Sequence, residues 1–318
     1  MENFNITEPE QNQNSVLPKP ILEENKKNWM RKSLISLGIY AVLFYFIFDK
    51  NFSYIAALLV VLLIHELGHF FAMKVFNYSN VKLFFIPLLG AYVTGKKTNI
   101  SQRQMTIVIL AGPIPGIIIG FCLILFNFIY PNAQILVLGN VFFFLNLFNL
   151  LPFMPLDGGR LLEVLFLKKN HTIRIMFTII SILALAIFSI WNKSIFFLLI
   201  PLSMVFELIM EIKNQKIREY LDSEKIDYNV SYNDLKDKDY WIIRDCLLLS
   251  FEKRYTGVPA GVHQYSIVEG GIINHINSIL KTPFIKDVMW LEKTAILITY
   301  IFFMVVLPII YILLQSIL

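Results

Sequence analysis

The chain has 318 residues, of which 56% are hydrophobic and only 16% charged, and its mean hydropathy is +0.62. This composition excludes an ordinary soluble domain and predicts a polytopic membrane protein. The formal net charge of +5 does not indicate a nucleic-acid partner, because the basic residues cluster between apolar runs, where membrane topology explains them. Two cysteines, Cys122 and Cys246, are too few for a disulfide framework and lack CxxC spacing.

Residues 1–30 are polar and rich in Asn, Glu and Pro, so we expect a disordered cytoplasmic tail. Beyond them lie apolar runs of the length that a membrane crossing of about 20 residues requires, although the first is short. These runs are Ser33–Phe48, Phe52–Phe76, Met105–Tyr130, Ala133–Pro152, Ile173–Trp191, Ser194–Ile212 and Thr294–Leu318. The predicted fold is an all-α polytopic membrane protein with about seven transmembrane helices.

Basic residues between the runs predict the orientation of the chain. They precede the first run and follow the second and the fourth, whereas the alternate loops hold at most one lysine. By the positive-inside rule the N-terminus is cytoplasmic, and we expect a multi-pass protein of the bacterial cell membrane. The residues that carry this bias are Lys26, Lys27, Arg31, Lys32, Lys96, Lys97, Arg103, Arg160, Lys168, Lys169 and Arg174.

The same runs predict four domains: the tail (1–30), a transmembrane core (31–212), a cytoplasmic segment (213–293) and a C-terminal transmembrane helix (294–318). Periodic apolar residues in the cytoplasmic segment predict two or three amphipathic helices around a loop. Its composition indicates no particular role.

The second run contains three ionisable residues in the sequence HELGH, namely His65, Glu66 and His69. Each charged residue at mid-membrane costs about 2.5–3.5 kcal/mol, so their presence indicates a function. On a helix, His65 and His69 lie on one face and can aim both imidazoles at one point, with Glu66 beside them. This is the HExxH spacing of zinc proteases. Two hydrogen-bonded core histidines are the alternative, but that interpretation leaves a carboxylate in the membrane without a partner.

After this run, VKLFFIPLLGAYVTG (Val81–Gly95) is apolar but too short to span and is interrupted by proline and glycine. We expect a re-entrant strand or hairpin, because non-helical backbone at that depth must be buried in protein or line a cavity. An unpaired strand edge could accept a substrate segment by β-augmentation. The alternative is an interfacial loop on the cytoplasmic surface. The third run contains AGPIPGIIIG (Ala111–Gly120), whose small residues would let a neighbouring helix approach closely.

The fourth run ends in NLLPFMPLDGGR (Asn149–Arg160). Two prolines break the helix near the cytoplasmic edge, and two glycines after Asp157 permit a sharp turn. An aspartate after a broken helix can reach a metal on a neighbouring helix. Taken alone, Asp-Gly-Gly is an ordinary turn. Paired with HExxH, however, Asp157 becomes the best candidate for a third metal ligand.

HELGH in one membrane helix, followed about 80 residues later by NLLPFMPLDGG, resembles the site-2 protease family of intramembrane zinc metalloproteases. The resemblance covers roughly Phe52–Leu167, with weaker echoes in LLGAYV and AGP. One departure is that many members carry an asparagine shortly after the AGP step, where this chain has Pro115-Gly116. The resemblance implies one zinc ion bound by His65, His69 and Asp157, with Glu66 as the catalytic base and Asn149 near the scissile bond.

The activity that the resemblance implies is zinc-dependent cleavage of peptide bonds in or near transmembrane segments of protein or peptide substrates within the lipid bilayer. This would serve regulated intramembrane proteolysis or membrane-peptide processing. The alternative is a non-proteolytic zinc-binding transporter or receptor. A transporter would need polar residues along a whole path, yet three of the runs are nearly devoid of them, and zinc binding alone would not require Glu66. Substrate identity and oligomeric state are not indicated by the sequence.

Overall fold

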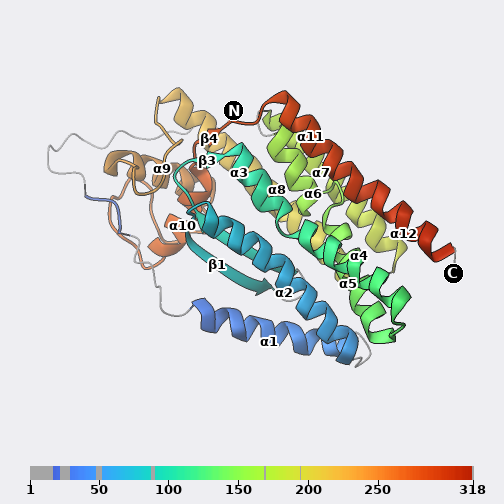
Figure 1. The fold of residues 1–318 in the computed structure, drawn as a ribbon. Coiled ribbons are helices and arrows are strands. Elements are labelled where there is room, and N and C mark those ends of the chain that lie inside the picture. The colour runs from blue at the N-terminus through green and yellow to red at the C-terminus, as the bar shows by residue number, and fades with distance from the viewer. Residues whose placement is uncertain are drawn as a thin grey trace. The chain divides into compact units, whose positions relative to one another are not determined.

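The computed structural model describes residues 17–21, 29–47, 52–86, 90–167, 170–193 and 195–316. These residues form mostly helices, with two short two-stranded sheets (Figure 1). The chain divides into two compact units, which we name the helical core (Lys26–Val205 with Phe284–Leu318) and the polar unit (Met1–Asn25 with Phe206–Pro283). The boundary falls inside one long helix, α8 (Ile195–Ser223).

Most elements belong to the helical core. They are α1 (Trp29–Ile47), α2 (Phe52–Val75), β1 (Ser79–Ile86), β2 (Gly90–Lys96), β3 (Ile100–Ser101), α3 (Gln102–Leu110), α4 (Pro113–Ile129), α5 (Ala133–Asn149), α6 (Asp157–Leu162), the π-helix η1 (Glu163–Leu167), α7 (His171–Trp191), β4 (Phe284–Ile285), α11 (Trp290–Ile301), the π-helix η2 (Phe302–Val306) and α12 (Leu307–Ser316).

Four described stretches are long and apolar enough to cross a membrane: Phe52–Val75, Gln102–Ile129, His171–Trp191 and Trp290–Leu314. Two further apolar helices, Ser33–Val42 and Ala133–Asn149, are shorter. The prediction of a mostly helical membrane protein is thereby confirmed. The count of about seven crossings stays a prediction, and its sixth run begins at Ser194, outside the described residues.

Two antiparallel strands, β1 and β2, follow α2, and together they cover most of the stretch Val81–Gly95 for which a strand or hairpin was predicted. Asn77 permits the chain reversal because asparagine tolerates the left-handed conformation, here with φ of 57°, that commonly ends a helix. In β1, Leu83 and Phe85 bury their side chains in one apolar cluster with residues of α1 and α2. Whether this hairpin re-enters the membrane stays a prediction.

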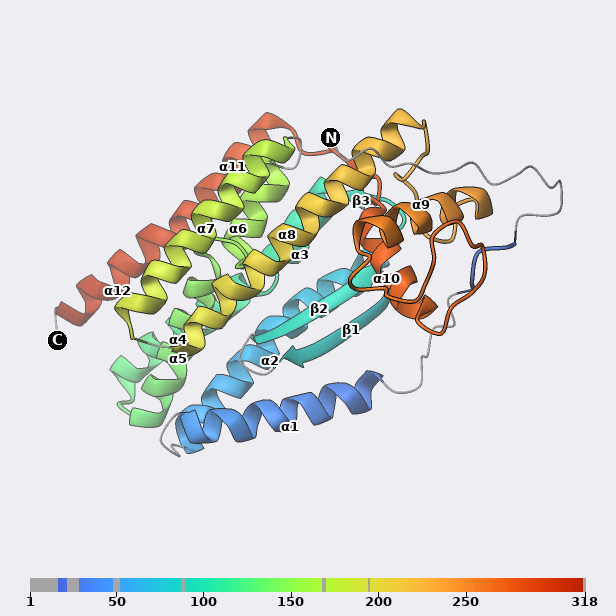
Figure 2. The same ribbon diagram turned by 180° about the vertical axis from the view of Figure 1, so that it is seen from behind.

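Helix α1 covers the outer edge of β1. The Ser33 hydroxyl donates to the Leu83 carbonyl (2.6 Å), and the Phe85 amide donates to the Ser36 hydroxyl (3.3 Å). These two backbone groups therefore point away from β2. Among the described residues β2 pairs only with β1, so it is an edge strand (Figure 2).

The predicted close approach of a helix to AGPIPGIIIG is found between α4 and α5. A Cβ atom built on Gly120 would lie 2.5 Å from the Phe143 amide nitrogen and 2.8 Å from the Gly139 carbonyl oxygen. Only a glycine leaves room for this backbone contact. Beside it, Ile117, Ile124 and Phe143 are fully buried in the largest cluster of the helical core.

The C-terminal helices pack into the same cluster through Tyr300 and Leu307. Their start is fastened to α3 by Asp287, which accepts hydrogen bonds from the Ser101 hydroxyl and the Arg103 amide (2.9 Å). Arg103 also forms an ion pair with Glu292 (2.5 Å). The C-terminal helices are therefore part of the structural core.

The polar unit is built on the second half of α8 with α9 (Asp237–Ser250) and α10 (Glu269–Ile279), where amphipathic helices were expected. Its core includes Ile217, Leu221, Trp241, Ile243 and Ile276, all essentially buried. Residues 17–21, which fall in the predicted disordered tail, are hydrogen-bonded to this unit. Residues 1–16 and 22–28 lie outside the described residues.

The contact between α4 and α5 predicts that Gly120→Ala destabilises the protein. The added methyl group would overlap backbone atoms of α5, and overpacking of this kind costs about 1–3 kcal/mol. Thermal unfolding in detergent measures the effect. Gly38→Ala in α1 is the matched control, because a Cβ there meets nothing within 4 Å and alanine is the better helix former. Equal unfolding temperatures for the two variants would contradict the proposed contact.

Candidate metal centre

Two histidines on α2 converge as their spacing predicted. One helical turn separates His65 from His69, and their Nε2 atoms lie 3.2 Å apart. Both side chains are buried, with residue exposures of 3% and 9%. The apolar residues of α2 therefore hold two imidazoles inside the helical core, where an unpartnered polar group would be costly.

Asp157 completes the cluster from the first position of α6. Its Oδ2 atom lies 3.1 Å from His65 Nε2 and 3.2 Å from His69 Nε2. The preceding loop is held from two sides, because the Tyr300 hydroxyl donates to the Leu150 carbonyl (2.7 Å) and the Met154 amide donates to Ser181 Oγ (3.0 Å). A Cβ on the residue after Asp157, Gly158, would lie 1.9 Å from the Leu150 carbonyl oxygen, which explains the need for glycine there.

The outward nitrogens of both histidines are also bound. His69 Nδ1 lies 2.7 Å from the Val108 carbonyl oxygen, and because a carbonyl only accepts, Nδ1 carries the proton. His65 Nδ1 lies 2.7 Å from Asn146 Oδ1. The amide of Asn146 is oriented by its own donation to the Phe142 carbonyl (2.7 Å), so His65 Nδ1 is also a donor. In neutral imidazoles both Nε2 atoms are then left as lone-pair acceptors.

With both imidazoles neutral, His65 Nε2, His69 Nε2 and Asp157 Oδ2 present lone pairs to one another at 3.1–3.2 Å. The Asp157 Oδ2 atom is buried. A divalent cation between the three atoms would remove the repulsion of these lone pairs. A tetrahedral zinc ion with bonds of about 2.0–2.1 Å spaces its ligands by about 3.3 Å, which fits this triangle. Two imidazoles and one carboxylate leave the fourth position open, as in catalytic zinc sites.

The other two predicted site residues differ in how closely they are tied to this cluster. Glu66 is buried, and its carboxylate interacts electrostatically with His65, His69 and Asp157. Asn149 is half-buried, and its side-chain amide donates to the Leu145 carbonyl in its own helix (3.2 Å). The structure therefore brings three predicted ligands together beside Glu66, whereas the role of Asn149 stays a prediction.

Sequence reasoning missed Asn146, which orients His65. Its signal was a further amide in an apolar helix, about one turn before Asn149. The structure also explains the departure at Pro115-Gly116. A Cβ on Gly116 would lie 2.2 Å from Asn146 Nδ2, so the amide comes from α5 and fills the space that a side chain on α4 would need. Gly112 is constrained likewise, because its Cβ would lie 2.4 Å from His69 Nε2.

The contact between Asn146 and His65 predicts that Asn146→Ala weakens zinc binding about 10- to 100-fold, the usual cost of losing a group that orients a metal ligand. Competition with a chelator of known zinc affinity measures the change. Asn149→Ala is the matched control, because the Asn149 amide donates to the Leu145 carbonyl of its own helix and not to either histidine. It should shift zinc affinity by less than about twofold. Unaltered affinity in Asn146→Ala would refute this role.

Part of the chain is similar in sequence to known proteases. Residues 53–137 match the sequence model of Peptidase family M50. Stage IV sporulation protein FB of Bacillus subtilis is 34% identical over 120 residues, covering 35% of this chain and 40% of that protein. The zinc metalloprotease MJ0392 of Methanocaldococcus jannaschii is 32% identical over 119 residues, covering 35% of this chain and 34% of that protein.

Among solved structures, the site-2 protease from Methanocaldococcus jannaschii aligns with a TM-score of 0.42 and 23% identity, over 55% of this chain and 86% of that one. This chain spans less than half the length of the two curated relatives. The matched residues include His65, Glu66 and His69 but end before Asp157. The resemblance inferred from the motifs is confirmed by the match of residues 53–137 to the model of Peptidase family M50.

Proposed function

We propose that this protein is a zinc-dependent intramembrane endopeptidase that cleaves peptide bonds in or near transmembrane segments of its substrates. The observation that carries the proposal is the triangle of two imidazole nitrogens and one carboxylate oxygen on α2 and α6, with Glu66 beside it. The match to Peptidase family M50 over the HELGH helix supports it. So does the name of the zinc metalloprotease relative.

His65, His69 and Asp157 would hold the metal. When bound, zinc supplies a Lewis acid and lowers the pKa of water to about 7, so that hydroxide is available at neutral pH. The Glu66 carboxylate accepts the proton from the attacking water and returns it to the leaving amine. Asn149 has two amide N–H donors, one of which bonds Leu145, so the other could donate to the developing oxyanion of the substrate.

Strand β2 is the proposed docking edge for the substrate. A transmembrane helix has its carbonyls hydrogen-bonded within the helix, so the cleaved segment must first unwind. The extended segment can then pair with an exposed edge by β-augmentation. The outer edge of β1 is covered by Ser33 and Ser36, whereas β2 is an edge strand among the described residues. Substrates with helix-breaking residues near the cut would be favoured.

The membrane arrangement that we propose has about seven crossings, a cytoplasmic N-terminus and the hairpin as a re-entrant element. Four apolar helices support a multi-pass membrane protein. The basic residues beside the first, second and fourth runs support the orientation. The bilayer that we propose is a bacterial cell membrane, and the metal would lie in its cytoplasmic half, where water can enter.

The rival function, a zinc-binding transporter or receptor without proteolysis, is not favoured by these observations. The described apolar stretch of α7 includes two buried hydroxyls, Ser181 and Ser189, and each bonds a carbonyl of its own helix. Ser181 also accepts from the Met154 amide, so among the described residues these two hydroxyls bond backbone groups and form no chain of polar side chains. The presence of Glu66 also matches a catalytic site, because the donor triangle is complete without it.

Glu66→Gln tests the catalytic assignment. This variant should keep one zinc ion per chain and lower peptide cleavage by about 100-fold or more, since glutamine cannot accept the proton. His65→Ala should lose both zinc and activity. Metal analysis and quantitative proteomics of membrane fragments, comparing each variant with the wild type, measure the two effects. Residual turnover near the wild-type rate in Glu66→Gln would contradict the assigned role.

Val93→Pro tests the docking edge. Val93 lies opposite Leu83, whose carbonyl points away from the partner strand, so in an antiparallel pair the Val93 amide also points outward. Proline removes that donor, which an edge strand tolerates. We expect cleavage to fall about tenfold with zinc content unchanged. Val93→Ala shortens the side chain but keeps the amide and is the control. Equal activity of the proline and alanine variants would exclude pairing through this edge.

A further inference from the structure

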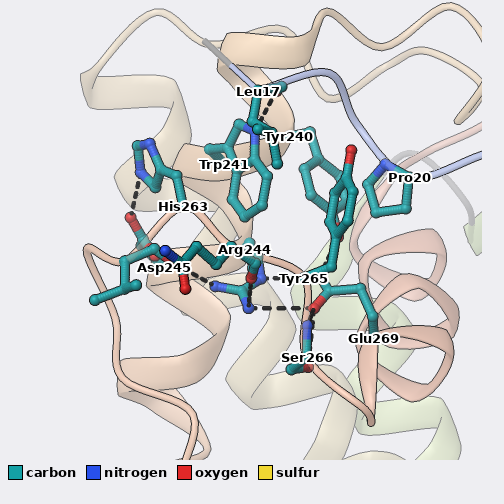
Figure 3. Close-up of polar contacts among 12 residues, drawn as sticks. Leu17, Pro20, Tyr240, Trp241, Arg244, Asp245, His263, Tyr265, Ser266 and Glu269 are labelled. Carbon is teal, nitrogen blue, oxygen red and sulfur yellow. Dashed lines mark hydrogen bonds and ion pairs between the residues drawn. The ribbon is translucent and has the colours of Figure 1, made fainter.

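The chain residues Leu17–Ile21, with the sequence Leu-Pro-Lys-Pro-Ile, lie against the polar unit without forming a helix or strand. Side chains of three aromatic residues donate hydrogen bonds to three of the carbonyls of this segment. Trp241 Nε1 donates to Leu17 (2.7 Å), the Tyr265 hydroxyl to Pro18 (2.5 Å) and the Tyr232 hydroxyl to Pro20 (2.8 Å). Figure 3 shows Leu17 above the edge of the Trp241 ring and Pro20 beside the neighbouring aromatic rings. We name this surface the aromatic groove.

The side chain of Lys19, between the two prolines, is surrounded by three backbone carbonyls of the polar unit. An ammonium group has three N–H donors and no acceptor. Lys19 Nζ lies 2.8 Å from the Tyr232 carbonyl and 2.7 Å from the Asn233 carbonyl, and it also bonds the carbonyl of Leu235. Its backbone amide donates to Asp237 Oδ1 (3.0 Å). Three fixed carbonyls match a point-like ammonium, whereas the planar fork of an arginine would not fit them.

The aromatic groove is braced from within the polar unit. Trp241 is 1% exposed and stacks between His263, at 5.0 Å between ring centroids, and Tyr265, at 6.0 Å. The Arg244 guanidinium lies 5.1 Å from the Trp241 ring centroid and is fixed by an ion pair with Glu269 (2.9 Å). Figure 3 shows these side chains converging beneath the bound segment. The donors are therefore positioned by the fold of the polar unit.

The ends of the bound segment contribute much less. Leu17 is 39% exposed and Ile21 is 90% exposed, so recognition is concentrated on the Pro-Lys-Pro centre and its carbonyls. A short extended sequence without secondary structure can be supplied by any chain that contains it. Aromatic grooves that bind extended proline-containing segments are a recurring mode of peptide recognition. If the segment left, the indole N–H of buried Trp241 would lose its partner, at a cost in free energy.

We propose that the aromatic groove of Tyr232, Trp241 and Tyr265 is a binding site for extended Pro-Lys-Pro segments of partner proteins, with residues 17–21 of this chain as its tethered competitor. Tethering raises the effective concentration of the internal segment to the millimolar range. A partner therefore binds when its segment is abundant or when the internal segment is weakened. This inference is independent of the proposed protease function.

A labelled peptide with the sequence of residues 14–25 tests the proposal on the full-length protein in detergent. Fluorescence anisotropy should show binding to Lys19→Ala at least about tenfold tighter than to the wild type, because the tethered competitor is weakened. A peptide with arginine in place of the central lysine should bind at least about tenfold more weakly. Adding Tyr265→Phe to Lys19→Ala should weaken binding, whereas adding Tyr228→Phe, whose hydroxyl bonds Asp222, should not.

A second measurement uses the wild type and does not depend on any variant folding. Excess unlabelled peptide should displace residues 17–21 and accelerate hydrogen exchange at the Lys19 amide, which is bonded to Asp237. No anisotropy change with Lys19→Ala up to about 1 mM peptide, together with unchanged exchange in the wild type, would overturn the proposal. Residues 17–21 would then only stabilise the fold of the polar unit. Equal affinity for the lysine and arginine peptides would overturn the proposed lysine site.

Discussion

The arrangement of the helical core is constrained by the need to hold two imidazoles and one carboxylate close together among apolar side chains. His65, His69 and Asp157 bring two imidazole nitrogens and one carboxylate oxygen to within 3.1–3.2 Å of one another inside the helical core. A bound cation would stabilise this cluster, and a metal ligand needs an outer partner to hold its orientation. The Val108 carbonyl and the Asn146 amide hold the imidazoles, and the loop before Asp157 is held by hydrogen bonds from other helices.

This constraint explains several residues that have no chemistry of their own. The helix that supplies the Val108 carbonyl must pass next to His69, so the chain carries Gly112 there. The Asn146 amide needs the space beside Gly116. Tyr300 reaches the ligand loop from the C-terminal helix, which links a segment far along the chain to the position of Asp157. The residues that let the helices pack closely are therefore also the ones that position the candidate metal ligands.

The sequence was sufficient to predict which three side chains converge, because their signals are local or chemically rare. HELGH gives two imidazoles on one helical face, and three ionisable groups in an apolar run indicate a site. The hairpin could be located because proline and glycine interrupt an apolar stretch. Asn146 could not be assigned, because its role depends on how closely α5 approaches α2 and α4. Nor could the contacts of residues 17–21, which bind side chains more than 200 positions away.

Zinc K-edge X-ray absorption of the purified protein tests the central claim most directly, because it reports the ligands without assuming an activity. The account predicts one zinc ion with a first shell of nitrogen and oxygen at about 2.0–2.2 Å, including the scattering pattern of two imidazoles. Asp157→Ala should lose the ion or alter that shell. A sulfur ligand at about 2.3 Å, or a shell without imidazole, would contradict a metal centre built from His65, His69 and Asp157.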